Sequence, residues 1–348
     1  MKRNGKAKWD RLRALPGKAA IYFVLICIGF VYLEPILEMI AKAMMSSADI
    51  VDPSVTWIPK SFSFDNLRVA AGVLNLKETL KNSILFSGGL AAAQTVVSAM
   101  TAYALSRYDF KGKKLWFVMI ILTFIMPVPV LMVPRLMMLV TAQTATGIQL
   151  VGTVIPQAAM AVLGQGVYSA VLILIFYTSF NMIPRVLDEA AAIDGASAWR
   201  VFWSIVVRIS GSTILVVFLF SFVWNWNETY MTGTLLRGNL ALLPAKLDMF
   251  NSEFESSASA VGGAFRLNEA YKMSATLISI SPLVLMYVFV QRRFIQGIEN
   301  TGITGEGYEE EKKKRRYPAG NIPVRLGRRS GVGAPAPGRS AAEHGRLP

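Results

Sequence analysis

The sequence predicts an all-α integral membrane protein with six transmembrane helices and an additional helix on the cytoplasmic side, between the fourth and the fifth. A hydrophobic share of 53% and a mean hydropathy of +0.43 exceed what a soluble domain of 348 residues can bury in one core. A hydrocarbon core of about 30 Å takes roughly 20 apolar residues to cross. Six stretches meet this requirement: 19–41, 83–106, 115–140, 148–176, 209–226 and 270–290.

The basic residues predict the orientation of these spans. Of 36 Lys and Arg residues, 26 precede the first span, follow the last, or lie in the second and fourth connections, which share one side of a six-span protein. The positive-inside rule therefore places both termini in the cytoplasm and the chain in the cell membrane. The net charge of +14 reflects this orientation, and no nucleic-acid partner is expected.

The first span follows a basic cytoplasmic segment, residues 1–18, and is expected to stay uncleaved as an anchor. Cys27, the single cysteine, lies within it, so the sequence offers no disulfide and no metal framework. The external segment that follows contains "TWIPKSFSFDNL", whose aromatic residues among polar ones are typical of a membrane interface.

The third span contains prolines and the fourth contains small residues. Pro127, Pro129 and Pro134 lie within eight residues of the third span, where they indicate either a break facing a cavity or a kink used only for packing. Arg135 is expected near the external end, where its side chain can reach the polar interface. Glycines in the fourth span predict close helix contacts.

The fourth connection, residues 181–209, is far longer than two adjacent helices need. A helix is expected to begin at or just after Asn181 with Pro184 in its first turn, to continue through three alanines, and to stop at Gly195. Ser197 can cap a second helix that leads into the fifth span. Local chemistry leaves two interpretations open: insertion into a groove on a cytoplasmic partner, or an amphipathic helix lying on the membrane.

A wider pattern bears on that choice. Glu189-Ala190-Ala191, three residues, Gly195, nine residues and Ile205 resemble the signature loop of permease subunits of binding-protein-dependent ABC importers. The segments "TAYALSRYDFKGKK", "FSFVWNWNETY" and "SPLVLMYVFVQRRFIQG" resemble the maltose-type, carbohydrate-transporting branch of that family. The likeness covers about residues 22–297, so the permease domain is expected at 19–297 and a polar, disordered cytoplasmic tail at 298–348.

The resemblance implies a function and a set of partners. The loop would form a coupling helix that contacts a separate ATPase subunit through Glu189, Ala190, Ala191, Asp194 and Gly195. The assembly would contain a second, homologous permease, two copies of the ATP-binding subunit and an extracytoplasmic solute-binding protein. This chain would bind no cofactor, with ATP and magnesium held by the ATPase. A permease for a non-sugar solute, such as an amino acid, a peptide or a phosphonate, remains the alternative.

Three polar residues are weak candidates for the translocation path: Gln157, Asn225 and Asn227. Asn amides bind sugar hydroxyls and aromatic rings stack on sugar faces. The "VWNWNETY" stretch is nevertheless also typical of the aromatic belts of membrane proteins of every function.

Other classes of membrane protein fit less well. The single histidine, His344, lies in the tail, and there is no H-E-x-x-H or G-x-S-x-G motif and no P-loop, so no catalytic or metal-binding residue is assigned. An ion-coupled secondary transporter would need ionisable residues within its spans, and Glu34, Glu38 and Arg135 are the few candidates.

Overall fold

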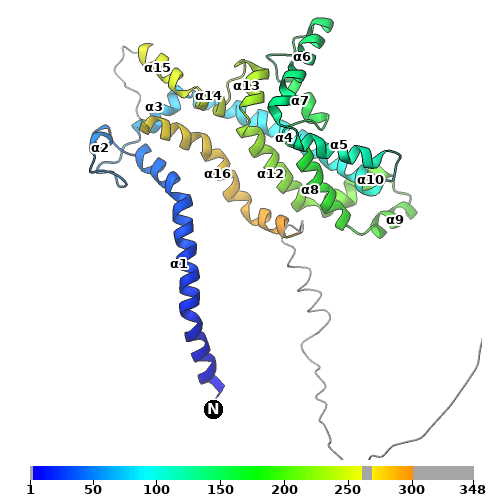
Figure 1. The fold of residues 1–348 in the computed structure, drawn as a ribbon, viewed down its shortest axis with the longest axis horizontal. Helices are drawn as coiled ribbons and strands as arrows, with labels where there is room; N and C mark the ends of the chain where they lie inside the picture. The colour runs from blue at the N-terminus through cyan, green and yellow to red at the C-terminus, as the bar shows by residue number, and fades with distance from the viewer. Residues whose placement is uncertain (1–2, 261–268, 301–348) are drawn as a thin grey trace, which may run out of the picture. The chain divides into compact units, whose positions relative to one another are not determined.

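The computed structural model describes residues 3–260 and 269–300, and these residues form helices without a β-strand. This confirms the all-α expectation. Their arrangement is drawn in Figure 1. The α-helices, with one π-helical segment η1, have these bounds: α1 Arg3–Ala43, α2 Ser47–Val51, α3 Asp65–Val73, α4 Leu76–Arg107, α5 Lys113–Ile125, α6 Val128–Thr146, α7 Ile155–Val162, α8 Ser169–Met182, α9 Val186–Ile193, α10 Ala198–Val201, η1 Phe202–Val206, α11 Val207–Ile209, α12 Gly211–Asn227, α13 Tyr230–Leu236, α14 Leu243–Asp248, α15 Phe250–Ala260 and α16 Glu269–Asn300.

Four helices in the described part of the chain are long and apolar enough to cross a membrane: α1 from Lys18, α4, α6 and α16 up to Arg292. Two bent pairs also qualify: α8 with α9, bent by 74°, and the helical stretch Ala198–Ile209 with α12, bent by 83°. Counting each pair as one span gives six. The predicted tail, 298–348, lies outside the described residues apart from its first three, which continue α16.

Two of the predicted spans are not continuous helices. The stretch 115–140 divides into α5 and α6 because Met126, which precedes Pro127, has an extended backbone (ψ 126°), as a residue before proline prefers. The stretch 148–176 divides into α7 and α8 because the chain between them takes left-handed conformations at Gly164 (φ 71°) and Tyr168 (φ 50°). Apolar composition continues across both breaks, so hydropathy alone does not reveal them.

Helix α4 packs against both α8 and α12 at the centre of the bundle (Figure 1). Small residues of α4, Ala99 and Ala102, share a buried cluster with the rings of Phe176 and Phe180 on α8. Small side chains allow helix backbones to approach closely. Such close packing holds helices together in lipid, where excluding water from apolar surfaces contributes nothing, so it suits a membrane interior.

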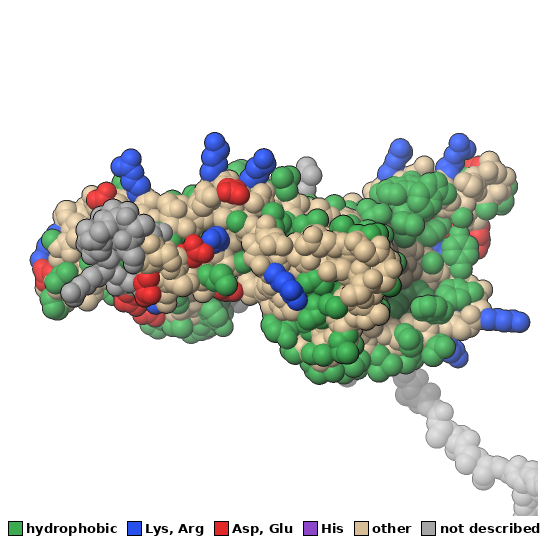
Figure 2. Space-filling model, turned by 90° about the horizontal axis from the view of Figure 1, so that it is seen from above, with side chains coloured by type: hydrophobic (Ala, Val, Ile, Leu, Met, Phe, Trp, Pro, Cys, Tyr) green, Lys and Arg blue, Asp and Glu red, His purple; other side chains and the backbone are tan. Residues whose placement is uncertain are grey.

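Helix α1 is the exception to this dense packing. None of the apolar window of α1 is buried within the chain, whereas 44% of the corresponding window of α4 is buried. Helix α1 packs most extensively on α16, and Lys42 near its end pairs with Glu269 at 3.0 Å. Broad hydrophobic patches between scattered Lys and Arg side chains are visible on the surface in Figure 2. Surfaces of this kind fit lipid or another membrane helix.

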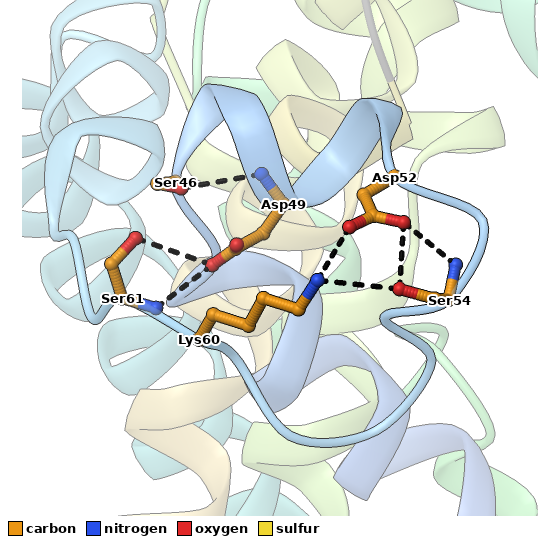
Figure 3. A network of polar contacts seen from close by, with 6 residues as sticks. All are labelled: Ser46, Asp49, Asp52, Ser54, Lys60 and Ser61. Carbon is orange, nitrogen blue, oxygen red and sulfur yellow. Dashed lines mark hydrogen bonds and ion pairs between the residues drawn. The ribbon is translucent and has the colours of Figure 1, made fainter.

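The segment between α1 and α4 is held by a polar network (Figure 3). The Asp49 carboxylate accepts the Ser61 N–H at 3.0 Å, and Asp52 pairs with Lys60 at 2.6 Å. The hydrogen bond from the Ser61 backbone lowers the pKa of Asp49, and the bond from the Lys60 ammonium lowers the pKa of Asp52. The network therefore fixes a loop that has little apolar core of its own.

The two ends of α4 meet different parts of the chain. Near its first turns, the Ser83 hydroxyl accepts the Leu243 N–H at 2.8 Å, which places the start of α14 at this end. At its last residue, Arg107 meets the segment that contains α9. Since α4 is 32 residues long, α9 and α14 lie at opposite ends of the bundle.

Candidate functional site

Helix α9 forms the centre of the long connection predicted at 181–209, but it begins later than expected. Helix α8 continues to Met182, and the chain then becomes extended at Ile183 (ψ 124°). The cause is Pro184, which disfavours helical backbone in the preceding residue. Pro184 therefore lies ahead of α9 and not in its first turn, and the expected start at or just after Asn181 is wrong.

The end of α9 is the one predicted. Gly195 has φ 75° and donates its N–H to the Ala192 carbonyl at 3.0 Å, while the Ala196 N–H reaches the Ala191 carbonyl at 2.9 Å. These two bonds form a Schellman motif, which needs a residue that accepts a left-handed backbone. The Ser197 side chain then caps α10 by accepting the Arg200 N–H at 3.4 Å, as expected.

The predicted contact residues divide between two faces of α9. Glu189, Ala190, Asp194 and Gly195 are exposed. Ala191 is only 8% exposed, because it lies on the face of α9 turned toward the rest of the chain. A direct partner contact for Ala191 therefore does not fit the structure. Ala191 instead helps to pack α9 against the rest of the chain.

The exposed face of α9 also contains apolar residues that were not assigned from the sequence. Ile193 is 87% exposed, and Val186 is exposed at the opposite end of the helix. Their position in the sequence could have identified them, since each is a large apolar residue at one end of a short alanine-rich helix outside the spans. Val186 and Ile193 are seven residues apart and so lie on the same face of α9, and apolar patches bordered by polar residues are found at sites that dock proteins or membranes.

An ion pair that the sequence did not reveal joins α9 to α4. Arg107 Nε lies 2.7 Å from Asp188 Oδ2, and the two side chains are 5% and 19% exposed. Arg107 also donates from Nη2 to the Ile183 carbonyl at 3.1 Å, and Arg185 donates to the Ser106 carbonyl at 3.2 Å. We call these three contacts the α4–α9 clamp. They fix α9 to the C-terminal end of α4.

A cavity of about 830 Å³ lies where α5, α6, α8, α12 and α13 meet. Asn227 is exposed and lines it, together with Trp224, Tyr230 and Arg135. The Trp224 and Tyr168 rings pack edge to face with centroids 4.9 Å apart. An aromatic lining with a few polar groups is the usual composition of a small-molecule site.

The other two candidates for the translocation path are buried away from this cavity. Gln157 is 3% exposed and donates to the Thr232 hydroxyl at 2.9 Å. Asn225 is 6% exposed and donates to Gln94 Oε1 at 2.6 Å, and Gln94 donates in turn to the Val167 carbonyl at 3.2 Å. Gln94 therefore links α4 to α12 and to the chain before α8. Of the three candidates for the translocation path, only Asn227 lines the cavity.

Within the described residues, no group of three or more His, Cys, Asp or Glu side chains could hold a metal ion.

The part of the chain that holds α9 and the cavity matches a known protein family. The model of the binding-protein-dependent transport system inner membrane component matches residues 94–300, which include the α4–α9 clamp, α9 and the cavity. The chain belongs to this family. This permease is thus a membrane subunit of a transporter, as the resemblance of its connection 181–209 indicated.

Related permeases cover nearly the same length. The chain is 24% identical over 283 residues to the probable starch degradation products transport system permease protein AmyC of Thermoanaerobacterium thermosulfurigenes, spanning 81% of this chain and 95% of the relative. It is 24% identical to the arabinooligosaccharides transport system permease protein AraQ of Halalkalibacterium halodurans, spanning 80% and 93%. It is 26% identical to the sn-glycerol-3-phosphate transport system permease protein UgpE of Yersinia pestis, spanning 79% and 94%.

A solved structure has the same fold. A chain of a bacterial ABC transporter involved in the import of the acidic polysaccharide alginate superposes with a TM-score of 0.67 at 18% identity. The match covers 81% of this permease and 98% of that chain.

Proposed function

We propose that this permease is one transmembrane half of an ATP-binding-cassette importer for a carbohydrate and that α9 is its coupling helix. The exposed face of α9, with Glu189 and Ile193, docks on a separate ATP-binding subunit. That subunit binds ATP and magnesium, while this chain binds no cofactor and catalyses no reaction. A solute-binding protein delivers the carbohydrate from outside.

The α4–α9 clamp is the observation that supports this proposal best. A helix that only lay on the membrane would need no buried ion pair to a transmembrane helix. Helix α9 instead presents carboxylates and an apolar residue outward while Arg107 and Asp188 fix its inner side. Movement of a docked ATPase would therefore be transmitted to α4 and to the helices packed on it.

The remaining partners follow from the family. We propose a heterodimer with a second, homologous permease and two ATPase copies, with α9 and both termini on the cytoplasmic side. A carbohydrate is the preferred solute because AmyC and AraQ are named for transport of starch degradation products and arabinooligosaccharides. UgpE is named for transport of sn-glycerol 3-phosphate, so a phosphorylated polyol is a second candidate solute.

The proposal is tested by purifying the full-length tagged chain from its native membrane in mild detergent and identifying the proteins that stay bound. We expect an ATPase and a second permease. Glu189→Lys should reduce ATPase retention about tenfold, since losing a charge pair at an interface costs at least roughly 1.4 kcal/mol.

The matched control is Asp248→Lys, the same charge reversal at an exposed site on α14, at the other end of the bundle. It should leave ATPase retention unchanged. A chain that purifies alone, or a Glu189→Lys variant that keeps its full complement of ATPase, would rule out α9 as the coupling helix and favour a secondary transporter.

A further inference from the structure

The cavity described above contains a cation that has no anionic partner among the described residues. Arg135, on α6, lines the cavity, and its described hydrogen bond is a long one, from Nη2 to Gln165 Oε1 at 3.4 Å. No described carboxylate lies within ion-pair distance of its guanidinium. A guanidinium presents five N–H donors in a planar fork, so most of its donors remain available to a ligand.

The acidic residue that lines the same cavity, Glu228, already accepts hydrogen bonds at both of its carboxylate oxygens. Glu228 Oε1 accepts the Met231 N–H at 2.7 Å, and Glu228 Oε2 accepts the Thr232 N–H at 2.9 Å and the Thr232 hydroxyl at 3.0 Å. These donors belong to the first turns of α13, where the helix dipole favours a negative charge. The cavity therefore offers a solute free donors at Arg135 and few free acceptors at Glu228.

The aromatic part of the lining suits the ring of a sugar. Tyr230 is 53% exposed, and the Trp224 and Tyr168 rings form one wall. Asn227, also exposed, adds an amide that can bind hydroxyls. Aromatic faces and a cation that pairs with none of the described carboxylates are thus present in a single cavity.

We propose that the Arg135 guanidinium binds an acidic group, a carboxylate or a phosphate, on the carbohydrate that this permease transports. The inference rests on the proposed function and names its solute class. A cation in a membrane cavity is costly unless it is paired, and a planar carboxylate or a phosphate matches the guanidinium fork with two charge-assisted hydrogen bonds. A neutral sugar offers only hydroxyl acceptors, which bind a guanidinium more weakly.

Protection of a thiol in the cavity wall tests this directly. In a Cys27→Ser background, Thr123→Cys places one thiol on the lining, and the full-length chain with the subunits that co-purify is placed in phosphatidylcholine nanodiscs. Alkylation of this introduced thiol is followed while galacturonate or galactose is added. Galacturonate should protect at about tenfold lower concentration than galactose, the ratio that 1.4 kcal/mol of extra binding gives.

Two variants identify the group responsible. Arg135→Gln should make the two sugars protect equally, and Arg135→Lys should keep part of the preference because it keeps the charge but loses the fork. sn-Glycerol 3-phosphate, as a second probe, should protect in the same Arg135-dependent way if phosphate binds as carboxylate does.

Three results would overturn the inference. Equal protection by galactose and galacturonate before any change at Arg135 would leave the importer and its carbohydrate in place but remove the acidic class. Lack of protection by either sugar would remove the cavity as their site. Protection that appears only when phosphatidylglycerol is added to the nanodiscs would assign Arg135 to a lipid headgroup. None of these depends on whether Glu189→Lys releases the ATPase, so the two proposals fail separately.

Discussion

At the scale of single residues, Gly195 shows how one backbone angle can decide where a helix ends. Its φ of 75° lies in the left-handed region, and a Cβ built at this position would meet no atom within 4 Å. Space is therefore not the constraint. The constraint is the backbone conformation that the Schellman motif requires, and it can be tested without crowding any neighbour.

Substitutions of Gly195 should reduce uptake in the order in which the new residues tolerate the left-handed conformation. Gly195→Asn should retain most uptake, because Asn enters the left-handed region readily. Gly195→Val should cost about 1–2 kcal/mol at this turn and displace the end of α9. Gly195→Pro should be worst, since it also removes the N–H bonded to Ala192.

The measurement is solute uptake per ATP hydrolysed in proteoliposomes, with the amount of membrane-inserted chain determined for each variant. Equal uptake by the Val and Asn variants would show that the shape of this turn does not matter to coupling.

At the scale of elements, α9 and α4 act as one unit through the α4–α9 clamp. Asp188→Asn should destabilise the protein by about 3 kcal/mol, because it leaves the Arg107 guanidinium, 5% exposed, without its counter-charge. The double variant Arg107→Met, Asp188→Leu should be more stable than the single variant, since it removes both charges. Thermal unfolding in detergent, followed by tryptophan fluorescence, gives the comparison. A double variant less stable than Asp188→Asn would mean that the Arg107 contact to Ile183 outweighs the ion pair.

The loop in Figure 3 should respond to acid. The pKa values of Asp49 and Asp52 are lowered in the folded loop, so their contribution to its stability is fully present above their ordinary pKa of 3.8 and is lost as the pH falls through the lowered values. Backbone hydrogen exchange of the peptide covering residues 46–62, corrected for the intrinsic pH dependence, should lose protection in that range. A peptide from α4 should not change. Retained protection at the lowest pH would show that the apolar contacts hold the loop without its carboxylates.

Features of the chain that follow from local chemistry could be predicted from the sequence. The stop at Gly195 and the cap at Ser197 need only neighbouring residues, and both were predicted correctly. The inward face of Ala191 and the ion pair between Arg107 and Asp188 depend on how α9 folds back on a helix about eighty residues earlier, and no local pattern encodes that. The break within 115–140 was one of the two alternatives that its prolines indicated, whereas the break within 148–176 was missed because hydropathy averages over the short turns that make it.

At the scale of the whole molecule, the orientation of the bundle can be tested by thiol labelling in a Cys27→Ser background. Thr56→Cys, in the loop after α2, and Lys111→Cys, in the turn after α4, are both at exposed positions near opposite ends of the bundle. If the positive-inside rule holds, a membrane-impermeant maleimide should label the Thr56→Cys variant in intact spheroplasts and the Lys111→Cys variant only after permeabilisation. The opposite pattern would place α9 outside the cell and exclude docking of a cytoplasmic ATPase.

The contact between α1 and α16 has a consequence for biosynthesis. Lys42 and Glu269 are 227 positions apart, so the first of the described helices packs mainly against the last of them, which is synthesised much later. Until α16 has been translated, α1 can anchor the nascent chain but cannot settle into its final place. Synthesis of α16, and not insertion of α1, is therefore the event that allows this contact to form.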